Sequence, residues 1–196
     1  MLLPDCTLFP HGGLPLYIFE ARYRKMLEEA LEGDCFFAVA RLLKKEVGEP
    51  SDYVAPVGTI GLVRASREQG DGTSQLLIHG VMRVRFSEWD MGGAYPQASI
   101  EPVISVFAPE KQAEAAMKTL RGAVEDAIRC LTEEVQSAIL ALLDRADEPA
   151  LMTDIICQQF IQEADLRQKL LEMDSVGDRI PEICEYLRTV SLAAED

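Results

Sequence analysis

The chain has 196 residues, of which 48% are hydrophobic and 27% charged, a composition that suits one ordinary domain or two small ones sharing a core. Its formal net charge of −14 argues against nucleic acid and anionic membrane surfaces as partners, because contacts with phosphate groups require clustered Lys and Arg. No apolar run reaches the length of a membrane span, and the first residues lack the basic region of a signal peptide, so we expect a cytosolic protein.

The cysteines and histidines show no pattern typical of a metal or cofactor site. The five cysteines are widely spaced and form no Cys-x-x-Cys pair, and the only histidines are His11 and His79. A structural zinc site needs four such ligands at short, paired spacings. We therefore expect reduced thiols, no metal and no cofactor, with each histidine bonded to nearby backbone.

The stretch Leu14–Leu31, which reads LPLYIFEARYRKMLEEAL, combines an extended segment and a helix. It begins apolar and extended, and its apolar residues then recur at the three- and four-residue steps of one helix face. The residues on that face are Phe19, Tyr23, Met26, Leu27 and Ala30. Prolines and glycines between residues 10 and 15 favour a bent approach, and Gly33 is placed to end the helix.

Four further segments up to residue 107 have the composition or alternation of β-strands. They are Phe36–Leu42, Val57–Arg67, Gln75–Glu88 and Tyr95–Phe107. Asp71-Gly72 predicts a hairpin turn between the second and the third, while Gly58 and Gly61 predict a bulge or a corner. Strands with such corners at short spacing predict a small, partly closed barrel.

Beyond Pro109 the apolar periodicity becomes helical. A long helix is predicted from Glu110 to Leu131, and further helices begin near Glu133, Pro149, Asp165 and Ser175. Strands first and helices second predict an α+β fold, in which an N-terminal barrel with one short helix precedes a C-terminal helical bundle. We place the division between residues 1–107 and 108–196.

The sequence contains neither a phosphate-binding loop nor a nucleophile elbow. Glu20, Arg22 and Tyr23 form a dense polar set where the first helix begins, and two interpretations stand. As a catalytic site, the set is a carboxylate poised by guanidinium groups; as structure, it caps the helix and braces neighbouring loops. Arg83 and Arg85 likewise indicate either a local basic patch or a solvated sheet face. We favour the structural interpretation of both sets.

The stretch Leu14–Leu31 also resembles the signature at the start of the Lon protease N-terminal domain family. The matching residues are Pro15, Leu16, Ile18, Phe19, Glu20, Arg22 and Tyr23. The segments FFAVARL, VGTIGLVRASR, LLIHGVMRVRF and LLEMDSVGDRIPEICEYL match further on, so the resemblance covers nearly the whole chain. It implies a PUA-like pseudo-barrel followed by a helical bundle, with the signature residues in fold-defining roles.

The resemblance further implies protein recognition, because in full-length Lon this domain helps to capture substrates and to assemble the ring. The chain ends where the ATPase and the Ser-Lys protease would begin, which implies neither ATP hydrolysis, nor proteolysis, nor any catalytic residue. We therefore expect a stand-alone, non-enzymatic module that binds proteins or unfolded segments. The expected surface is the loop before the first helix, with Phe9, Leu16 and Tyr17, provided that these side chains are exposed.

Two alternatives stay open. One is a small-molecule-binding or enzymatic role in a barrel-mouth pocket lined by Glu20, Arg22 and the strand arginines. A deep site with converging polar groups favours it, and a shallow surface argues against it. The other is an assembly-forming domain that self-associates, which sedimentation would detect.

Overall fold

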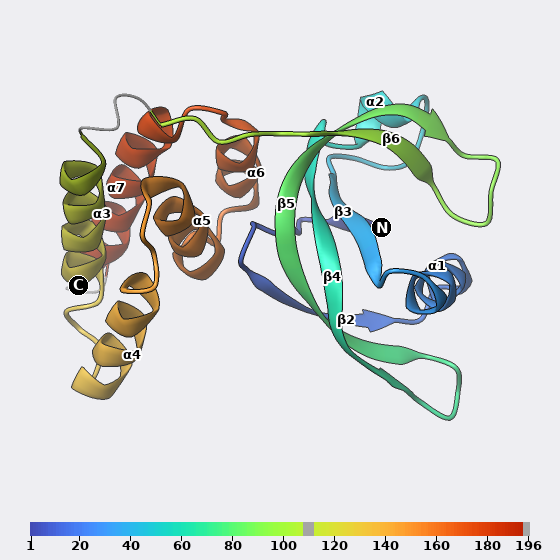
Figure 1. Cartoon of the computed structure of the whole chain (residues 1–196), viewed down its shortest axis with the longest axis horizontal. Coiled ribbons are helices and arrows are strands. Elements are labelled where there is room, and N and C mark those ends of the chain that lie inside the picture. The colour runs from blue at the N-terminus through green and yellow to red at the C-terminus, as the bar shows by residue number, and fades with distance from the viewer. Residues whose placement is uncertain (108–111, 194–196) are drawn as a thin grey trace. The chain divides into compact units, whose positions relative to one another are not determined.

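The computed structural model describes residues 1–107 and 112–193, and it divides into two compact units (Figure 1). The first, called here the sheet unit, comprises Met1–Val103 and Ala164–Glu172; the second, the helical unit, comprises Ile104–Glu163 and Met173–Asp196. The predicted α+β class is confirmed. The division at residue 107 stays a prediction, and one C-terminal helix, α6 (Ala164–Glu172), groups with the sheet.

The described part of the sheet unit contains six strands, which are mostly antiparallel. In chain order its first elements are β1 (Leu2–Pro4), β2 (Gly13–Ile18), α1 (Ala21–Glu32), β3 (Phe36–Leu42), α2 (Pro50–Tyr53), β4 (Val57–Glu68), β5 (Ser74–Asp90) and β6 (Gln97–Pro102). Hydrogen bonds link the strands in the order β1-β3-β4-β5-β2, and β6 also pairs with β5. This hydrogen-bonded path ends at β1 and at β2, so the sheet is not a closed barrel. Figure 1 shows that the sheet is curved.

Strand β5 connects most of the sheet because its two halves pair with different strands. Residues 74–79 pair with β2 and residues 84–90 pair with β6, while β4 runs beside most of its length. Near its middle, the N–H of Gly80 donates to the carbonyl of Gly12, and the Gly80 carbonyl accepts from the N–H of His11, both at 2.8 Å. These two bonds hold the glycine-rich loop before β2 against β5.

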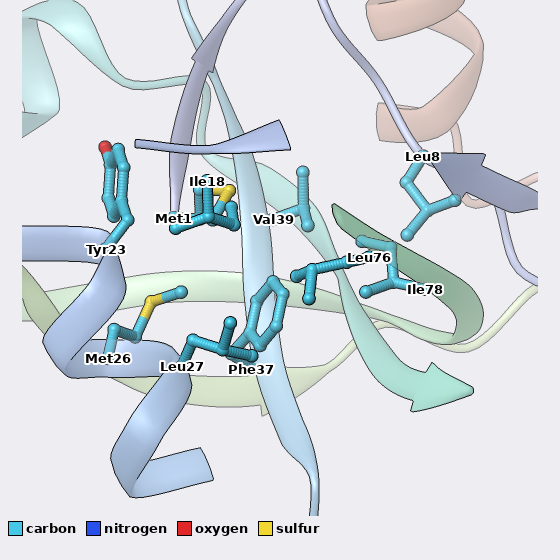
Figure 2. Packing of buried hydrophobic residues seen from close by; sticks show 10 residues of the cluster. All are labelled: Met1, Leu8, Ile18, Tyr23, Met26, Leu27, Phe37, Val39, Leu76 and Ile78. Carbon is cyan, nitrogen blue, oxygen red and sulfur yellow. The ribbon is translucent and has the colours of Figure 1, made fainter. Parts of the chain in front are cut away.

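The core of the sheet unit forms between α1 and the strands. Figure 2 shows side chains of α1 projecting into the same cluster as those of β3 and β5. The buried members of this cluster are Met1, Leu8, Ile18, Tyr23, Met26, Leu27, Phe37, Val39, Leu76 and Ile78. Removal of these apolar groups from water is the main stabilising contribution, and it explains why the three- and four-residue spacing in α1 predicts the inward face.

Helix α6 belongs to the sheet unit because side chains connect it to the N-terminal strands and loops. Arg167 donates to the carbonyl of Thr7 at 2.6 Å, and Arg83 of β5 donates to the carbonyl of Leu171 at 2.7 Å. Both donors are charged, so these hydrogen bonds are stronger than those between neutral groups. The amphipathic pattern of α6 predicts a helix, but it does not predict which unit the helix packs against.

The helical unit contains α3 (Ala113–Ala127), α4 (Glu133–Leu143), α5 (Pro149–Phe160) and α7 (Val176–Ala193). The helix predicted to reach Leu131 ends at Ala127, and its predicted beginning, at Pro109 and Glu110, lies outside the described residues. Ser175 Oγ accepts a hydrogen bond from the Asp178 N–H at 3.2 Å, as the predicted cap of the last helix requires. None of the described helices combines the length and apolar character of a membrane span.

Candidate functional site

The polar residues at the start of α1 contact neighbouring chain segments. Arg22 makes a bidentate ion pair with Glu46 at 2.9 and 3.0 Å and bonds to Glu20 at 3.0 Å. The Arg22 guanidinium also lies 4.7 Å from the centre of the Tyr23 ring. The Tyr23 hydroxyl accepts from the N–H of Leu2 and donates to its carbonyl, each at 3.0 Å. These contacts join β1 and the loop after β3 to α1, which supports a structural role for the signature residues.

The expected binding surface before α1 is only partly exposed. Phe9 is fully buried, and the Arg167 guanidinium lies 5.3 Å from the centre of its ring. Leu16 is half-buried and packs against the core cluster. The expectation that Phe9 contributes to a free surface is therefore wrong, because α6 returns from far along the chain and covers it.

Two aromatic side chains near the end of β2 are exposed. Tyr17 is 53% exposed and stacks on Phe19, with ring centres 6.1 Å apart. Phe19 is 62% exposed and precedes α1, so its predicted place on the inner face of the helix is corrected. Of the remaining signature residues, Ile18 is buried in the core and Pro15 is exposed. The segment before α1 therefore exposes a small aromatic patch, which consists of Tyr17 and Phe19.

The polar residues of the alternative barrel-mouth pocket do not converge on one place. Arg83 is fully buried and bonds to the Leu171 carbonyl, whereas Arg85 is exposed. Arg22 is engaged with Glu20 and Glu46. The structure therefore does not bring these residues together as an acid–base site.

The two histidines lie close together. The centres of the His11 and His79 rings are 6.4 Å apart and their planes are nearly perpendicular. His11 has a positive φ of 62°, and its N–H bonds to Gly80 as described above. Burial, and then the charges of His11 and Arg64, lower the pKa of His79.

The lowered pKa of His79 gives a pH dependence of stability. The folded chain holds the His79 proton less tightly than the unfolded chain, so this contribution is complete above the ordinary pKa of 6.5 and is lost as the pH falls below it. We expect a His79→Gln variant to lose less of its free energy of unfolding than the wild type on acidification through that window. Urea unfolding at a series of pH values measures this, and superimposable pH profiles would contradict it.

The sheet unit contains a groove of about 480 Å³ lined by residues of α1, β3 and the β5–β6 hairpin. Five aromatic side chains line it, namely Phe36, Phe37, Phe86, Trp89 and Tyr95. The aliphatic lining residues are Met1, Leu2, Met26, Ala30, Ala38, Ala40, Ile60, Ala98 and Ile100. The volume lies within the range of roughly 300–1,000 Å³ that is typical of ligand sites, which are likewise mostly apolar.

A bulge in β5 turns two of these aromatic rings to the same face. In a regular strand, residues three positions apart point to opposite faces. Here the register with β6 shifts between Ser87 and Trp89, and Glu88 has a positive φ of 47°. Phe86 and Trp89 consequently lie side by side, with ring centres 5.3 Å apart. Such bulges commonly redirect a side chain next to a functional site.

The charged side chains that line the groove are acidic. Glu29 accepts a hydrogen bond from the Tyr95 hydroxyl at 2.5 Å, which raises the pKa of Tyr95. Asp34 accepts a hydrogen bond from the N–H of Phe36 at 3.2 Å. Within residues 1–107 and 112–193, no Lys, Arg or His lines the groove, and no group of three possible metal ligands occurs. The groove therefore combines an apolar, aromatic surface with two carboxylates.

A family model for the substrate-binding domain of ATP-dependent protease La (LON) matches residues 1–189. The chain belongs to this family. The Lon resemblance is thereby confirmed.

Individual relatives agree with the family assignment. Lon protease of Escherichia coli strain K12 is 26% identical over 186 residues, and that of Desulfosudis oleivorans is 22% identical over 191 residues. These matches cover 94% and 95% of this chain, but the chain spans only 23% of the length of each relative.

Solved structures of Lon N-terminal domains share the fold. The N-terminal domain of the Mycobacterium avium complex Lon protease superposes with a TM-score of 0.76 at 14% identity, covering 96% of both chains. A Lon N-terminal domain protein from Xanthomonas campestris gives a TM-score of 0.63 at 19% identity, covering 93% of this chain and 94% of that one. At such identities the agreement concerns the fold alone.

The groove of this Lon substrate-binding domain was not predicted from the sequence. Its clearest signal was Trp89, the one tryptophan of the chain, which stands among polar residues near the end of a predicted strand. Regular alternation places Trp89 opposite Phe86, and only the bulge at Glu88 puts both on the same face.

Proposed function

We propose that this chain is a non-enzymatic polypeptide-binding module and that the groove of the sheet unit holds an extended or unfolded segment of the bound protein. The main support for this proposal is the groove itself, in which Phe36, Phe86, Trp89 and Tyr95 gather on one unit of a Lon substrate-binding domain. Aromatic side chains dominate the binding energy of interfaces because each buries a large area.

The composition of the groove favours binding over catalysis. In the part of the chain that the structure describes, its lining includes no Ser, Cys, Lys or His side chain that would serve as a nucleophile or base, and its two carboxylates, Glu29 and Asp34, are already hydrogen-bonded. The Tyr17–Phe19 patch is a second candidate surface for the same partner class. We also propose that the chain acts in the cytosol and that it binds neither nucleic acid nor membranes. The net charge of −14 supports the absence of these two partner classes. Self-association is proposed as a separate property.

Filling the groove should weaken the binding of an unfolded protein. Ala98 of β6 lines the groove, whereas its neighbour Ser99 does not. Reduced and carbamidomethylated α-lactalbumin with a fluorescent label serves as the probe, and fluorescence anisotropy measures its binding. We expect Ala98→Arg to weaken binding at least about tenfold, which corresponds to roughly 1.4 kcal/mol.

Ser99→Arg is the matched control because it places the same side chain one residue further along the same strand. It should leave the dissociation constant within about twofold of the wild-type value. Equal binding by the wild type and Ala98→Arg would exclude the groove as the site, and no binding by the wild type would contradict the proposed function as a whole.

A further inference from the structure

The first half of β3 has an unpaired edge inside the groove. On one side, Phe36 to Val39 pair with Leu62 to Thr59 of β4. On the other side, β1 pairs only with residues 40–42, and no other described strand pairs with β3 there. Phe36, Phe37 and Ala38 all line the groove. An edge of this kind presents backbone donors and acceptors to any further strand that fits.

The strand register shows which backbone groups face the groove. The N–H of Val63 in β4 bonds to the carbonyl of Cys35, so the odd-numbered residues here direct their backbone groups to β4. The even-numbered residues point to the opposite side, where the amino group of Met1 donates to the Ala38 carbonyl at 2.6 Å and the Phe36 N–H bonds to Asp34. The N–H of Ala38 and the carbonyl of Phe36 are left facing the groove, with no described strand beside them.

The side chains around this edge define the chemistry of an added strand. The Phe86 and Trp89 rings form an apolar surface that suits large apolar side chains at alternate positions. Glu29 and Asp34 are exposed and line the same groove, whereas Lys25, whose ammonium lies 3.6 Å from Glu29, is not among the described lining residues. A cationic side chain on the bound segment would complement these two carboxylates, whereas an anionic one would be repelled.

We propose that the bound segment adds to the edge of β3 at Phe36–Ala38 as a further β-strand and carries a Lys or Arg beside Glu29 and Asp34. This inference rests on the proposed function, because it specifies how the same groove recognises its polypeptide. In this binding mode, hydrogen bonds from the main chain of the segment provide the affinity. The apolar and basic side chains of the segment provide the selectivity.

The main-chain part is tested with short synthetic peptides that carry phenylalanine at alternate positions, threonine between them and one terminal lysine. Two N-methylated versions block the amides on one edge or on the other. Trp89 fluorescence and anisotropy of a labelled peptide report binding to the full chain. We expect one methylated version to bind at least about tenfold more weakly than the parent, through lost hydrogen bonds, and the other to stay within about twofold. Parent-like binding by both would overturn strand addition while leaving the proposed function intact.

The charge part is tested by exchanging the peptide lysine for glutamate. We expect this peptide to bind about tenfold more weakly than the parent to the wild type, and the difference to shrink to about twofold in the double variant Glu29→Gln, Asp34→Asn. A difference that survives in the double variant would overturn the assigned basic contact. If unfolded α-lactalbumin binds but the parent peptide does not, the inference fails and the proposed function stands; if neither binds, both fail.

Discussion

A Gly80→Ala variant should lose about 3 kcal/mol or more of its free energy of unfolding. A Cβ at this position would lie 2.1 Å from the carbonyl oxygen of Phe9 and 2.9 Å from its carbonyl carbon. The obstruction is backbone rather than the end of a flexible side chain. Relief therefore requires the loop to separate from β5, which breaks the bonds that Gly80 forms with His11 and Gly12. Urea unfolding followed by circular dichroism measures the loss.

Gly70→Ala is the control for this prediction within the same unit. No heavy atom lies within 4 Å of a Cβ built on Gly70, and this residue is exposed. Its substitution should change stability by no more than about 0.5 kcal/mol, as is usual for surface positions. A Gly80→Ala variant that unfolds at the same urea concentration as Gly70→Ala would show that the close approach to Phe9 is not required.

Replacement of Arg179 by Met should destabilise the helical unit by about 3–5 kcal/mol. The Arg179 side chain is fully buried and donates to Asp154 at 3.0 Å, to Ser105 at 3.4 Å and twice to the Met173 carbonyl, at 2.9 and 2.6 Å. Removal of the guanidinium takes the ion pair with Arg179 away from the Asp154 carboxylate, which is only 5% exposed. The unfolding transition of the helices, followed by circular dichroism, reports the effect.

Arg121→Met provides the comparison for Arg179. Arg121 also forms ion pairs on the helices, with Glu125 and Asp144, but all three side chains are at least one third exposed. Such surface pairs contribute about 0–1 kcal/mol, so this variant should unfold close to the wild type. Equal destabilisation by the two substitutions would mean that burial of the Arg179–Asp154 pair does not decide its importance.

Local sequence patterns predicted the elements whose conformation depends on residues close together in the sequence. The apolar run Phe36–Leu42 is β3 with the same limits, and the alternation from Val57 predicts β4 to within one residue. Gly61, which predicts a bulge, lies at a shift in the β4–β5 register. In each case side-chain period and glycine flexibility act within a few residues, so a single sequence carries the information.

Features that depend on distant partners were missed or misplaced. Phe9 was expected on the surface, but Arg167 of α6 covers its ring after a return of the chain over more than half its length. The signature residues were assigned a structural role, yet nothing local shows that Arg22 pairs with Glu46 or that Tyr23 bonds to Leu2. The groove depends on the bulge at Glu88 and on an incomplete pairing of β1 with β3, and neither can be read from side-chain alternation.

The Lon-type signature therefore explains how the sheet unit is assembled, whereas the proposed binding surface lies elsewhere on that unit. Tyr23 and Met26 illustrate the connection between the two. Both are buried residues of α1 in the core, and Met26 also lines the groove beside the carboxylate of Glu29. A stable α1 is accordingly a condition for a formed groove.

Binding in the groove is tested most directly by NMR, which follows the backbone amide and indole N–H signals of the isotope-labelled chain while unlabelled, unfolded α-lactalbumin is added. If the groove holds the polypeptide, the indole signal of Trp89 and the amide signals of Ala98 and Ile100 should shift in proportion to the bound fraction. Unchanged signals at these residues, with shifts confined to Tyr17, Phe19 or the helical unit, would show that the polypeptide binds outside the groove.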